Sequence, residues 1–531
     1  MAIWNSFRDD DYLSLVPWAR FDLVSEGAPS PFSFVGGVAP EVVASLHEAH
    51  RVLNNSVEAA ITDVFEGRSA LQDPAFRALV EDAYAELVQS RADLRQHIRC
   101  GRDFDGTFRW EFPIDPSQRP RVKFSGLQLV NGLTKQATSF DFDRPMTPAV
   151  GKLLGVLDGT HRMAEVQQVL ASVGPDLEPR LVHLLEALKE QQCMATSARS
   201  SVGAYWLANT HDRDVVHLGH AGLAYRLGDE FLFFDPWLVP WFAEAPMPSL
   251  WCGLLPKPAA IFLTHEHGDH LDRRTLLQMP KDVPVIVPSR RNRRALYYDY
   301  RMVLGELGFS QIIELAHGER WPFDGGVVEA LPFFGEDPCD LELPRNCYLV
   351  ADRGRNTLVQ ADSGPTNDGR SAVKEGVIED LVRRNGPVLT VFASQQQLFE
   401  VRARSVSACL SPPGRWLERG ENGYLTNAYL EQVAVSAKAR LFVSYATGGA
   451  AWLPDNLPFV FGPGRPAGRA LLTAYWEPME RLGELLRLQG CSYHYSRALD
   501  VFRATPDGGV QVVDGSERFD PSRLFGVDSG G

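Results

Sequence analysis

The chain lacks the features that would mark a membrane or a secreted protein. In its 531 residues no stretch approaches the roughly 18 consecutive apolar residues that indicate a membrane span. The opening sequence MAIWNSFRDDDYLSL has no basic start followed by a long apolar run, as a secretory signal would have. The sequence therefore predicts a cytoplasmic protein with no membrane contact.

Cysteine is scarce and scattered. The seven cysteines are odd in number and never stand in a CxxC pair, so they predict neither a disulfide framework nor a thiolate zinc site. Each is expected to be a reduced, small and buried apolar residue. They are Cys100, Cys193, Cys252, Cys339, Cys347, Cys409 and Cys491.

An excess of positive charge is also absent. The chain has 53 Lys and Arg against 67 Asp and Glu, a net charge of −14, which disfavours general binding to nucleic acid or an anionic membrane. The exception is an arginine cluster in SRRNRRALYYDY, formed by Arg290, Arg291, Arg293 and Arg294. It predicts either a docking patch for an acidic carrier protein or a phosphate, or only the solvated start of a helix.

The length of the chain predicts two or three domains, and its 44% hydrophobic and 23% charged residues are typical of a globular protein. Residues 1–145 have mostly helical spacing, as in EVVASLHEAHRVLNNSVEAAITDVF, with a short alternating hairpin from Arg119. Residues 146–200 predict three short helices with a turn at Asp158–Gly159. Residues 201–510 predict a catalytic domain, and 511–531 a loose tail.

From Asp214 the pattern is that of an α/β domain, with buried strands separated by helices. The stretch HLGHAGLAYRLGDEFLFFDPWL predicts two strands joined at Gly228–Asp229. The other predicted strands are 259–264, 283–288, 327–334, 346–351, 357–362, 388–393 and 439–445.

Four side chains of metal-ligand type follow one of these strands within six residues, in AIFLTHEHGDHLD. His265 and His267 are alternate residues of an extended segment, so they face the same way and can bind one metal ion. Asp269 and His270 follow directly and are predicted to face a second ion, with Gly268 allowing the loop to turn. The alternative is a histidine-rich surface loop, which the fixed spacing disfavours.

This HxHxDH motif resembles the signature of the metallo-β-lactamase superfamily, and the resemblance covers about Asp214 to Tyr495. It implies an αββα sandwich. The GHA and DPWL elements resemble the lactonase and phospholipase-D-like branch, and VQADSG places Asp362 where the superfamily has its bridging aspartate. Residues 146–200 resemble small winged-helix, PqqD-like domains.

Two features depart from the hydrolases of that superfamily. Glu336, in EALPFFGEDPCD, stands where they have a histidine, and no late histidine lies between His317 and His494. A site richer in oxygen donors favours iron or manganese over zinc. These departures resemble the diiron oxygenases of nonribosomal peptide assembly, which include the β-hydroxylase of chloramphenicol biosynthesis, over nearly the whole chain.

That resemblance implies a ligand set for two iron ions, with O₂ as co-substrate. One ion would be bound by His265, His267 and Glu336, the other by Asp269 and His270, and Asp362 would bridge them. It also implies an electron donor, a homodimer through the N-terminal region, and a biosynthetic intermediate as substrate. An amino acid tethered to a peptidyl carrier protein is the substrate of the related enzyme.

Four further residues are candidates with alternatives left open. Gln396 stands where the related enzyme has a glutamate ligand, and either coordinates through its carbonyl oxygen or hydrogen-bonds nearby. His220 either lies over the metals or is a satisfied histidine at a strand end. Asp235 either hydrogen-bonds the metal loop or caps a turn before Pro236. His494 is a candidate for a displaced late ligand.

The sequence therefore supports a diiron hydroxylase acting on a natural-product intermediate as the main hypothesis. The alternative is a zinc or manganese hydrolase of the lactonase or phosphodiesterase type, with metal-bound hydroxide as the nucleophile. A third possibility is a binding protein with a structural metal site, although two-metal sites are rarely only structural.

Overall fold

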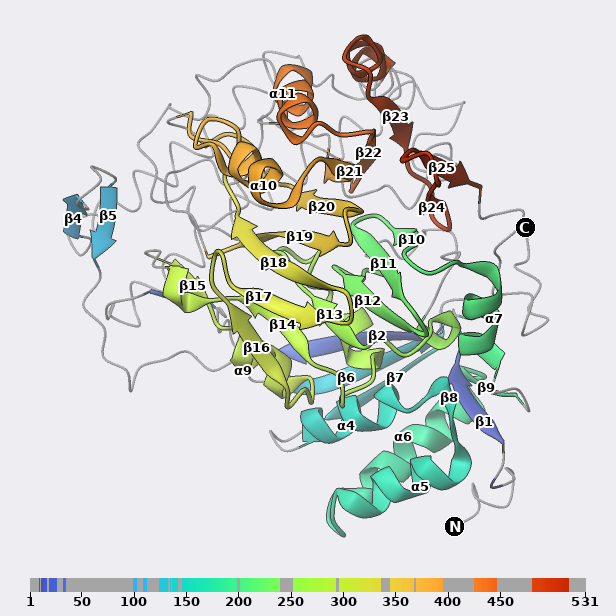
Figure 1. Cartoon of the computed structure of the whole chain (residues 1–531). Helices are drawn as coiled ribbons and strands as arrows, with labels where there is room; N and C mark the ends of the chain where they lie inside the picture. The colour runs from blue at the N-terminus through green and yellow to red at the C-terminus, as the bar shows by residue number, and fades with distance from the viewer. Residues whose placement is uncertain are drawn as a thin grey trace, which may run out of the picture.

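Two large sheets form the centre of the molecule (Figure 1). The computed structural model describes residues 9, 11–16, 19–25, 32–34, 99–102, 108–111, 124–131, 134, 136–141, 146–197, 201–238, 252–292, 296–335, 344–366, 369–394, 425–446 and 480–514. None of the helices in this part of the chain has the length and apolarity needed to cross a membrane.

The first sheet has eight strands, and the four at one side of it run parallel, including the strand that leads into the metal motif. In spatial order they are β16 (Ile312–Leu315), β14 (Val285–Pro288), β13 (Ala260–Phe262), β12 (Glu230–Phe234), β11 (Gly222–Leu227), β10 (Val215–Gly219), β24 (Val501–Ala504) and β25 (Val510–Val513).

Two predictions for this sheet need correction. The stretch predicted as two strands forms three, β10 to β12, because Gly219 and His220 turn the chain with positive φ angles of 123° and 46°. The tail predicted from residue 511 overlaps β25, which continues to Val513 in an antiparallel pair with β24, and residues 515–531 lie outside the described residues.

The second sheet has seven strands, and the last four of them run parallel. In spatial order they are β17 (Arg320–Phe323), β18 (Gly326–Pro332), β19 (Asn346–Asp352), β20 (Asn356–Ala361), β21 (Val388–Ser394), β22 (Leu441–Tyr445) and β23 (Ser492–Tyr495). The seven strands predicted individually are confirmed, two in the first sheet and five in the second.

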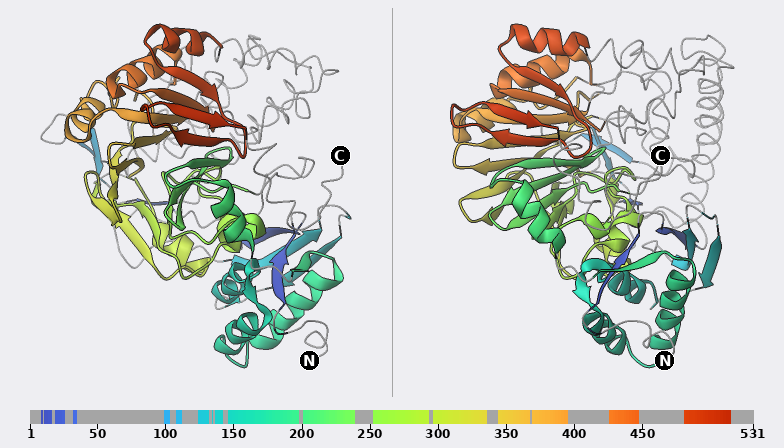
Figure 2. Two further views of the ribbon diagram at one scale, coloured as in Figure 1. Left: turned by 45° about the vertical axis from the view of Figure 1, so that its right-hand side comes forward. Right: turned by 90° about the vertical axis from the view of Figure 1, so that its right-hand side faces the viewer.

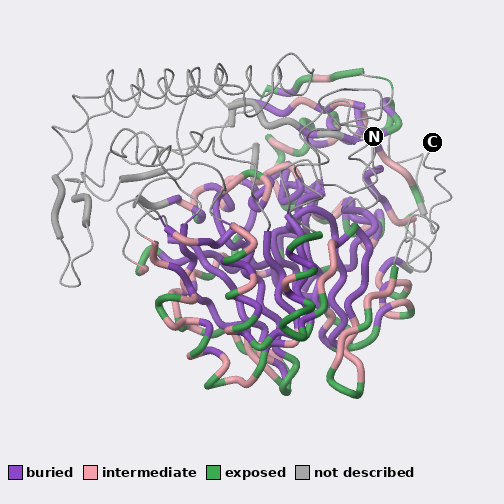
Figure 3. Tube along the Cα trace, turned by 90° about the horizontal axis from the view of Figure 1, so that it is seen from above, coloured by how far each residue is buried: buried purple, intermediate pink, exposed green. Residues whose placement is uncertain are grey.

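The sheets pack face to face, and helices cover their outer faces. Phe234 and Phe262 of the first sheet share a core with Tyr348 and Phe392 of the second. Helices α10 (Val377–Asn385) and α11 (Asn427–Ala437) cover the outside of the second sheet. Helices α7 (Ser201–Asn209), α8 (Arg273–Gln278) and α9 (Tyr300–Glu306) cover the first. The predicted αββα sandwich is therefore present, and buried backbone runs through its centre (Figure 3).

A smaller unit lies at one end of the molecule, where α4, α5 and α6 gather (Figure 2). The three predicted helices are α4 (Met146–Gly155), α5 (Met163–Ser172) and α6 (Glu178–Glu190). The predicted turn at Asp158–Gly159 begins a strand, β8 (Asp158–Arg162). Strand β1 (Tyr12–Leu15), from the start of the chain, lies between β8 and β9 (Met194–Ser197). The unit thus includes a strand from outside the predicted range 146–200.

The rest of the described N-terminal region consists of short strands. The hairpin predicted from Arg119 corresponds to β6 (Phe124–Asn131) and β7 (Ala137–Asp141), with β2 (Ala19–Ser25) on the other side of β6. Two small pairs are β4 (Arg99–Arg102) with β5 (Phe108–Glu111), and β3 (Phe32–Phe34) with β15 (Leu296–Tyr298). The helices predicted in 41–65 and from Phe76 lie outside the described residues.

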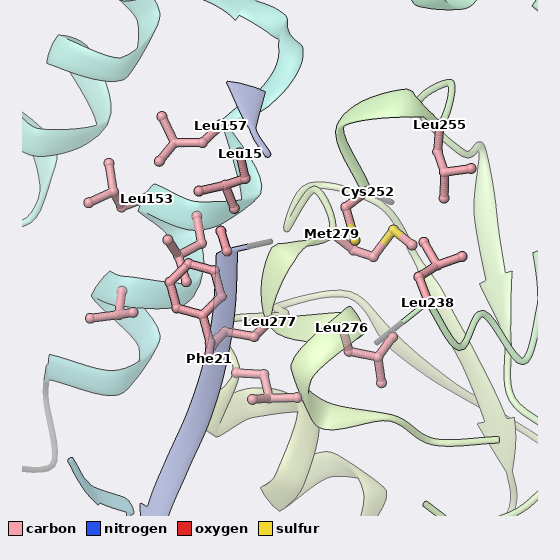
Figure 4. Packing of buried hydrophobic residues seen from close by; sticks show 14 of the residues in the cluster. Leu15, Phe21, Leu153, Leu157, Leu238, Cys252, Leu255, Leu276, Leu277 and Met279 are labelled. Carbon is pink, nitrogen blue, oxygen red and sulfur yellow. The ribbon is translucent and has the colours of Figure 1, made fainter. Parts of the chain in front are cut away.

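The small unit and the sandwich share one apolar core (Figure 4). Phe21 and Leu153 lie on one side of it, and Leu277 and Met279 of the sandwich on the other. Helix α4 approaches closely through Gly151, where an added Cβ would lie only 2.0 Å from the carbonyl oxygen of Leu307. The two parts therefore pack tightly at this point, because the contact leaves no space for a side chain.

Candidate metal centre

The motif lies on the loop between β13 and α8, at the carboxyl end of parallel strands. Its exit is fixed by Asp272, whose carboxylate accepts hydrogen bonds from the backbone N–H groups of Arg274 (3.3 Å) and Thr275 (3.1 Å) at the start of α8. The loop closes on itself, because the N–H groups of His270 and Leu271 both donate to the carbonyl of His267. Strand β13 and a helix cap therefore hold both ends of the motif.

Asp235, fully buried after β12, organises the loop from beneath. Its carboxylate accepts from the N–H of Thr264 (2.7 Å), from the Thr264 hydroxyl, and from Nδ1 of His270 (2.8 Å). A carboxylate can only accept, so His270 carries its proton on Nδ1. The Thr264 hydroxyl gives its proton to Asp235 and can only accept from Nδ1 of His265, 2.9 Å away. Asp235 thus leaves Nε2 of both imidazoles as the ligand atom.

Asp362 faces His270 from the second sheet. Its Oδ2 lies 3.3 Å from Nε2 of His270, and Nε2 makes no hydrogen bond to any described residue. Burial opposes a charged imidazole here, but Asp362 and Asp235 raise the pKa of His270 well above its usual value. The site therefore stabilises a positive charge at this point.

The segment that carries Asp362 is locked to the segment that leads to Glu336. The Ser363 hydroxyl accepts from the N–H of Phe334 (3.0 Å), and the N–H of Gly364 donates back to the Phe334 carbonyl (2.9 Å). Gly335 has φ 66°, and a Cβ there would meet the carbonyl oxygens of Gly364 and Pro365 at 2.6 Å. Only glycine suits this close approach.

Strand ends around the site hold non-glycine residues in the left-handed conformation. His220, Asp235 and Ala446 follow β10, β12 and β22, and Ala361 is the last residue of β20; their φ angles lie between 40° and 51°. Each such residue costs of order 1 kcal/mol or more, and such strain tends to gather at functional sites. Four such residues around one site indicate that the local backbone conformation serves a function and not stability.

His220 contacts the exposed side of the loop. Its Nε2 lies 3.0 Å from Oδ2 of Asp269, and its ring packs edge-on against Trp237. Burial would raise the pKa of Asp269, but the hydrogen bond from His220 and the nearby imidazoles lower it well below the usual value. Asp269 is therefore a carboxylate, with one oxygen hydrogen-bonded and the other facing away from His220.

His267 differs from the other two imidazoles. Its side chain is 34% exposed, whereas those of His265 and His270 are buried. Next to it, Glu266 forms a buried ion pair with Arg345, whose Nη2 lies 3.2 Å from Nε2 of His267. Phe333, three residues before Glu336, packs against the ring of His265 with 5.2 Å between centroids.

These residues fit a metal ion. Ligand atoms about 2.1 Å from a shared ion lie about 3.0–3.4 Å apart at tetrahedral or octahedral angles. The separation of His270 Nε2 from Asp362 Oδ2, 3.3 Å, lies in this range. His220, Asp269 and His270 also have ligand atoms that lie within 4.8 Å of one another. The imidazole and carboxylate donors suit iron, manganese or zinc.

The other candidates are placed differently. Glu336 and Gln396 lie outside the described residues. His494, on β23, donates from Nε2 to the carboxylate of Asp500 (2.7 Å), and it is not among the described groups that could share an ion. In the arginine cluster, Arg290 pairs with Glu314 and Arg291 with Glu319, while Arg293 and Arg294 are outside the described residues.

Several supporting residues were not predicted from the sequence. Arg345, His217 and Ser496 act through contacts across 78 to 279 positions of the chain, so no local pattern marks them. Glu266 could have been found, because an acidic residue inside a buried ligand loop needs a partner. The four described cysteines, Cys193, Cys252, Cys347 and Cys491, are buried free thiols, as predicted.

Comparison with known proteins starts from the whole chain. No known family profile matches it. CmlA, a diiron β-hydroxylase from Streptomyces venezuelae, has a solved structure that is 16% identical, with a TM-score of 0.52 and coverage of 92% of this chain and 98% of that chain. A point mutant of CmlA gives a TM-score of 0.57 at 17% identity, with coverage of 92% and 100%.

Curated sequences give a shorter match. The cytidine monophosphate-N-acetylneuraminic acid hydroxylase of Mus musculus is 36% identical over 166 residues, which is 29% of this chain and 27% of that protein. The Sus scrofa enzyme is 36% identical over 165 residues, 29% of this chain and 36% of that protein. The match thus spans well under half the length of these relatives. The two packed sheets and the overlap with CmlA show that this chain has the metallo-β-lactamase fold, in the form found in a diiron β-hydroxylase.

Proposed function

We propose that this chain is an O₂-dependent diiron hydroxylase acting on a natural-product biosynthetic intermediate. The observation that carries the proposal is the structural overlap with CmlA over 92% of the chain, which extends well beyond the sandwich. A likeness limited to the sandwich would support only a metal-dependent enzyme of this fold, because one fold serves many reactions.

The curated relatives add support by an independent route. They are also hydroxylases by name, although they act on a nucleotide-linked sugar and match only part of the chain. Two comparisons, one of structure and one of sequence, thus lead to enzymes that hydroxylate.

The donor set supports iron. The proposed ligands are three imidazoles and three carboxylates, from His265, His267, His270, Asp269, Asp362 and Glu336. Carboxylate-rich two-metal sites are the usual home of diiron proteins, and bound iron would supply the O₂ chemistry here. The protein's part is to fix the ligand tautomers through Asp235 and to bury His265, His270 and Asp362 away from water.

For the substrate, we propose an amino acid tethered to a peptidyl carrier protein. Because Arg290 and Arg291 pair with glutamates, the arginine cluster offers less positive charge for docking a carrier protein than its sequence suggests. An electron donor is required as a partner, because the reaction consumes reducing equivalents.

The test begins with metal content and an optical spectrum. Protein made in iron-supplemented medium and purified without added metal should contain about two irons per chain and show near-ultraviolet absorption of a bridged diferric centre. After anaerobic reduction, O₂ should be consumed with carrier-bound amino acids, and mass spectrometry should detect a gain of one oxygen atom.

A different outcome would favour the other hypothesis. Zinc or manganese in the purified protein, no near-ultraviolet band, and cleavage of lactones or phosphodiesters would identify a hydrolase. A hydroxylated nucleotide sugar, with no reaction on carrier-bound amino acids, would keep the hydroxylase and replace the substrate.

A further inference from the structure

We propose that His217 is a positioning residue for the second metal position, defined as Asp269, His270 and Asp362. It acts through His220, which holds Asp269, so a hydrogen-bonded chain runs from Ser496 to the candidate ligand. The proposal rests on the metal centre of the proposed function, but not on its substrate or reaction.

His217, on β10, is a buried imidazole with both nitrogens engaged. Its Nε2 lies 2.7 Å from the carbonyl oxygen of His220, and its Nδ1 lies 2.7 Å from the hydroxyl of Ser496. A carbonyl can only accept, so Nε2 carries the proton. Nδ1 then accepts, and the Ser496 hydroxyl donates to it. The His220 carbonyl thereby fixes the tautomer of His217, and the Ser496 hydroxyl satisfies the other ring nitrogen and holds the ring in place.

The backbone of His220 needs this support. Its φ angle of 46° is unfavourable for a residue with a Cβ. The His220 carbonyl accepts a second hydrogen bond from the N–H of Ala446 (3.0 Å), which follows β22 in the other sheet. The two donors, one from each sheet, therefore clamp the turn between β10 and β11 in its strained form.

The imidazole of His220 passes this constraint on to the metal loop. Its Nε2 lies 3.0 Å from Oδ2 of Asp269, and the His220 side chain is fully buried, whereas that of Asp269 is 19% exposed. Asp269 sits beyond Gly268 on a loop, so a fixed donor is what orients its carboxylate. With Oδ2 engaged, Oδ1 is directed away from His220 as the ligand atom.

His217 also anchors the segment that carries its partner. The N–H of Leu499 donates to the backbone carbonyl of His217 (2.7 Å), and the N–H of His217 donates to the carbonyl of Asp500 (2.9 Å). These backbone bonds do not depend on the imidazole. Replacing the side chain therefore removes the hydrogen-bonded chain to Asp269 while leaving the pairing of β10 with this segment in place.

The experiment compares two substitutions at one position. His217→Leu removes the donor to His220 at similar volume, and His217→Gln restores a donor, since a glutamine amide reaches close to the position of imidazole Nε2. Anaerobic titration with Fe(II), followed by calorimetry, measures the affinity of each position. We expect His217→Leu to lower the affinity for the second ion about 10- to 100-fold and the affinity for the first ion less than about threefold. His217→Gln should recover most of the lost affinity.

A matched control lies in the same region. His494→Leu removes another imidazole that is hydrogen-bonded to the 496–500 segment, through Asp500, but has no link to His220. It should leave both affinities unchanged. Ser496→Ala is a smaller change, and it should lower the affinity for the second ion less than His217→Leu does. If His217→Leu does not fold, the Ser496→Ala variant provides the test.

The outcomes separate the two proposals. If the unaltered protein binds no Fe(II), the proposed iron centre is wrong, and the positioning role that rests on it is overturned as well. If the unaltered protein binds two ions, and His217→Leu or Ser496→Ala binds both as tightly, the metal centre stands and the positioning role is overturned. Equal weakening of both ions in His217→Leu and His494→Leu would mean a general structural effect and would also overturn it.

Discussion

The two sides of the candidate metal centre are built differently. On the second side, His270 is fully buried, hydrogen-bonded through Nδ1 to Asp235, and faced by Asp362 from the other sheet. On the first side, His267 is 34% exposed, and its neighbour is the charge pair of Glu266 with Arg345. A network of neutral and charged hydrogen bonds thus holds His270, and it reaches His265 through Thr264. His267, in contrast, lies beside a single ion pair.

The difference shows how a buried site can be organised before any ion binds. A carboxylate beneath a histidine selects the tautomer that leaves Nε2 for a ligand, at the cost of a buried charge. That cost is acceptable only while every donor to the carboxylate is present. The second side should therefore be the more sensitive to loss of its support, and the first side the more dependent on its own ligands.

Removal of Asp235 should have the largest effect. Asp235→Ala leaves two N–H groups and a hydroxyl without their acceptor in a buried site, which should lower the free energy of unfolding by on the order of 5 kcal/mol. Affinity for the second ion should be lost as well, and affinity for the first should fall, because Asp235 also fixes the tautomer of His265 through Thr264. Urea denaturation of the metal-free protein measures the first effect. As a control, Asp507→Ala, at an exposed carboxylate in the β24–β25 turn, should leave the unfolding curve unchanged. Equal unfolding curves for the unaltered protein, Asp235→Ala and Asp507→Ala would contradict the role of Asp235.

Breaking the ion pair on the first side should cost less. Arg345→Met leaves the carboxylate of Glu266 buried and unpaired, which should destabilise the protein by about 3 kcal/mol. The double variant Arg345→Met with Glu266→Gln should recover part of this, because no buried charge then remains. Denaturation of the single and double variants tests this. A double variant less stable than Arg345→Met would mean that the pair contributes through more than charge balance.

The contrast also bears on what the sequence could predict. The strands from 259–264 to 439–445 could be predicted because each is a short, buried apolar run, and the motif could be found because its ligands lie within six residues. The left-handed residues and the chain from Ser496 to Asp269 could not, since they depend on strand ends that meet only in the folded sandwich.

Smaller errors have similar causes. The turn at His220 was hidden because GHAG fits an extended pattern as well as a turn, so β10 and β11 were predicted as one strand. At Asp158–Gly159 local turn residues suggested an end to regular structure, but pairing with β1, almost 150 residues earlier, makes a strand there. In both places contacts between distant segments decide the conformation.

Substitution of Glu336 should isolate the first position. Glu336→Gln keeps the size of the side chain and removes its charge, so we expect affinity for the first ion to fall about 10- to 100-fold, while the second ion is retained. Stability without metal should not change. Metal analysis after gel filtration, with calorimetric titration, measures the two affinities. Loss of both ions together would show that the two positions do not bind metal independently, which would contradict the difference between the two sides.

The smallest effect is expected at a second imidazole–carboxylate pair, outside the centre. His161 Nδ1 lies 2.9 Å from Oδ1 of Asp158 in the small unit, and His270 Nδ1 lies 2.8 Å from Oδ2 of Asp235. The His161 side chain, however, is 22% exposed. The hydrogen bond to Asp158 raises the pKa of His161, against the opposing effect of burial. Because the folded-state pKa lies above the unfolded value of about 6.5, the pair stabilises fully below that pH.

This stabilisation should be lost as pH rises through the raised pKa of His161. Asp158→Asn keeps an acceptor for the turn but removes the charge, so the pKa of His161 should fall toward its ordinary value. The stability gained below pH 6.5 should then shrink by less than about 1 kcal/mol, because a partly exposed pair is screened by water. NMR titration of the His161 ring protons measures the shift. If the pKa of His161 is the same in Asp158→Asn as in the unaltered protein, Asp158 does not raise it. The difference between this pair and the pair of His270 with Asp235 would then be one of exposure alone.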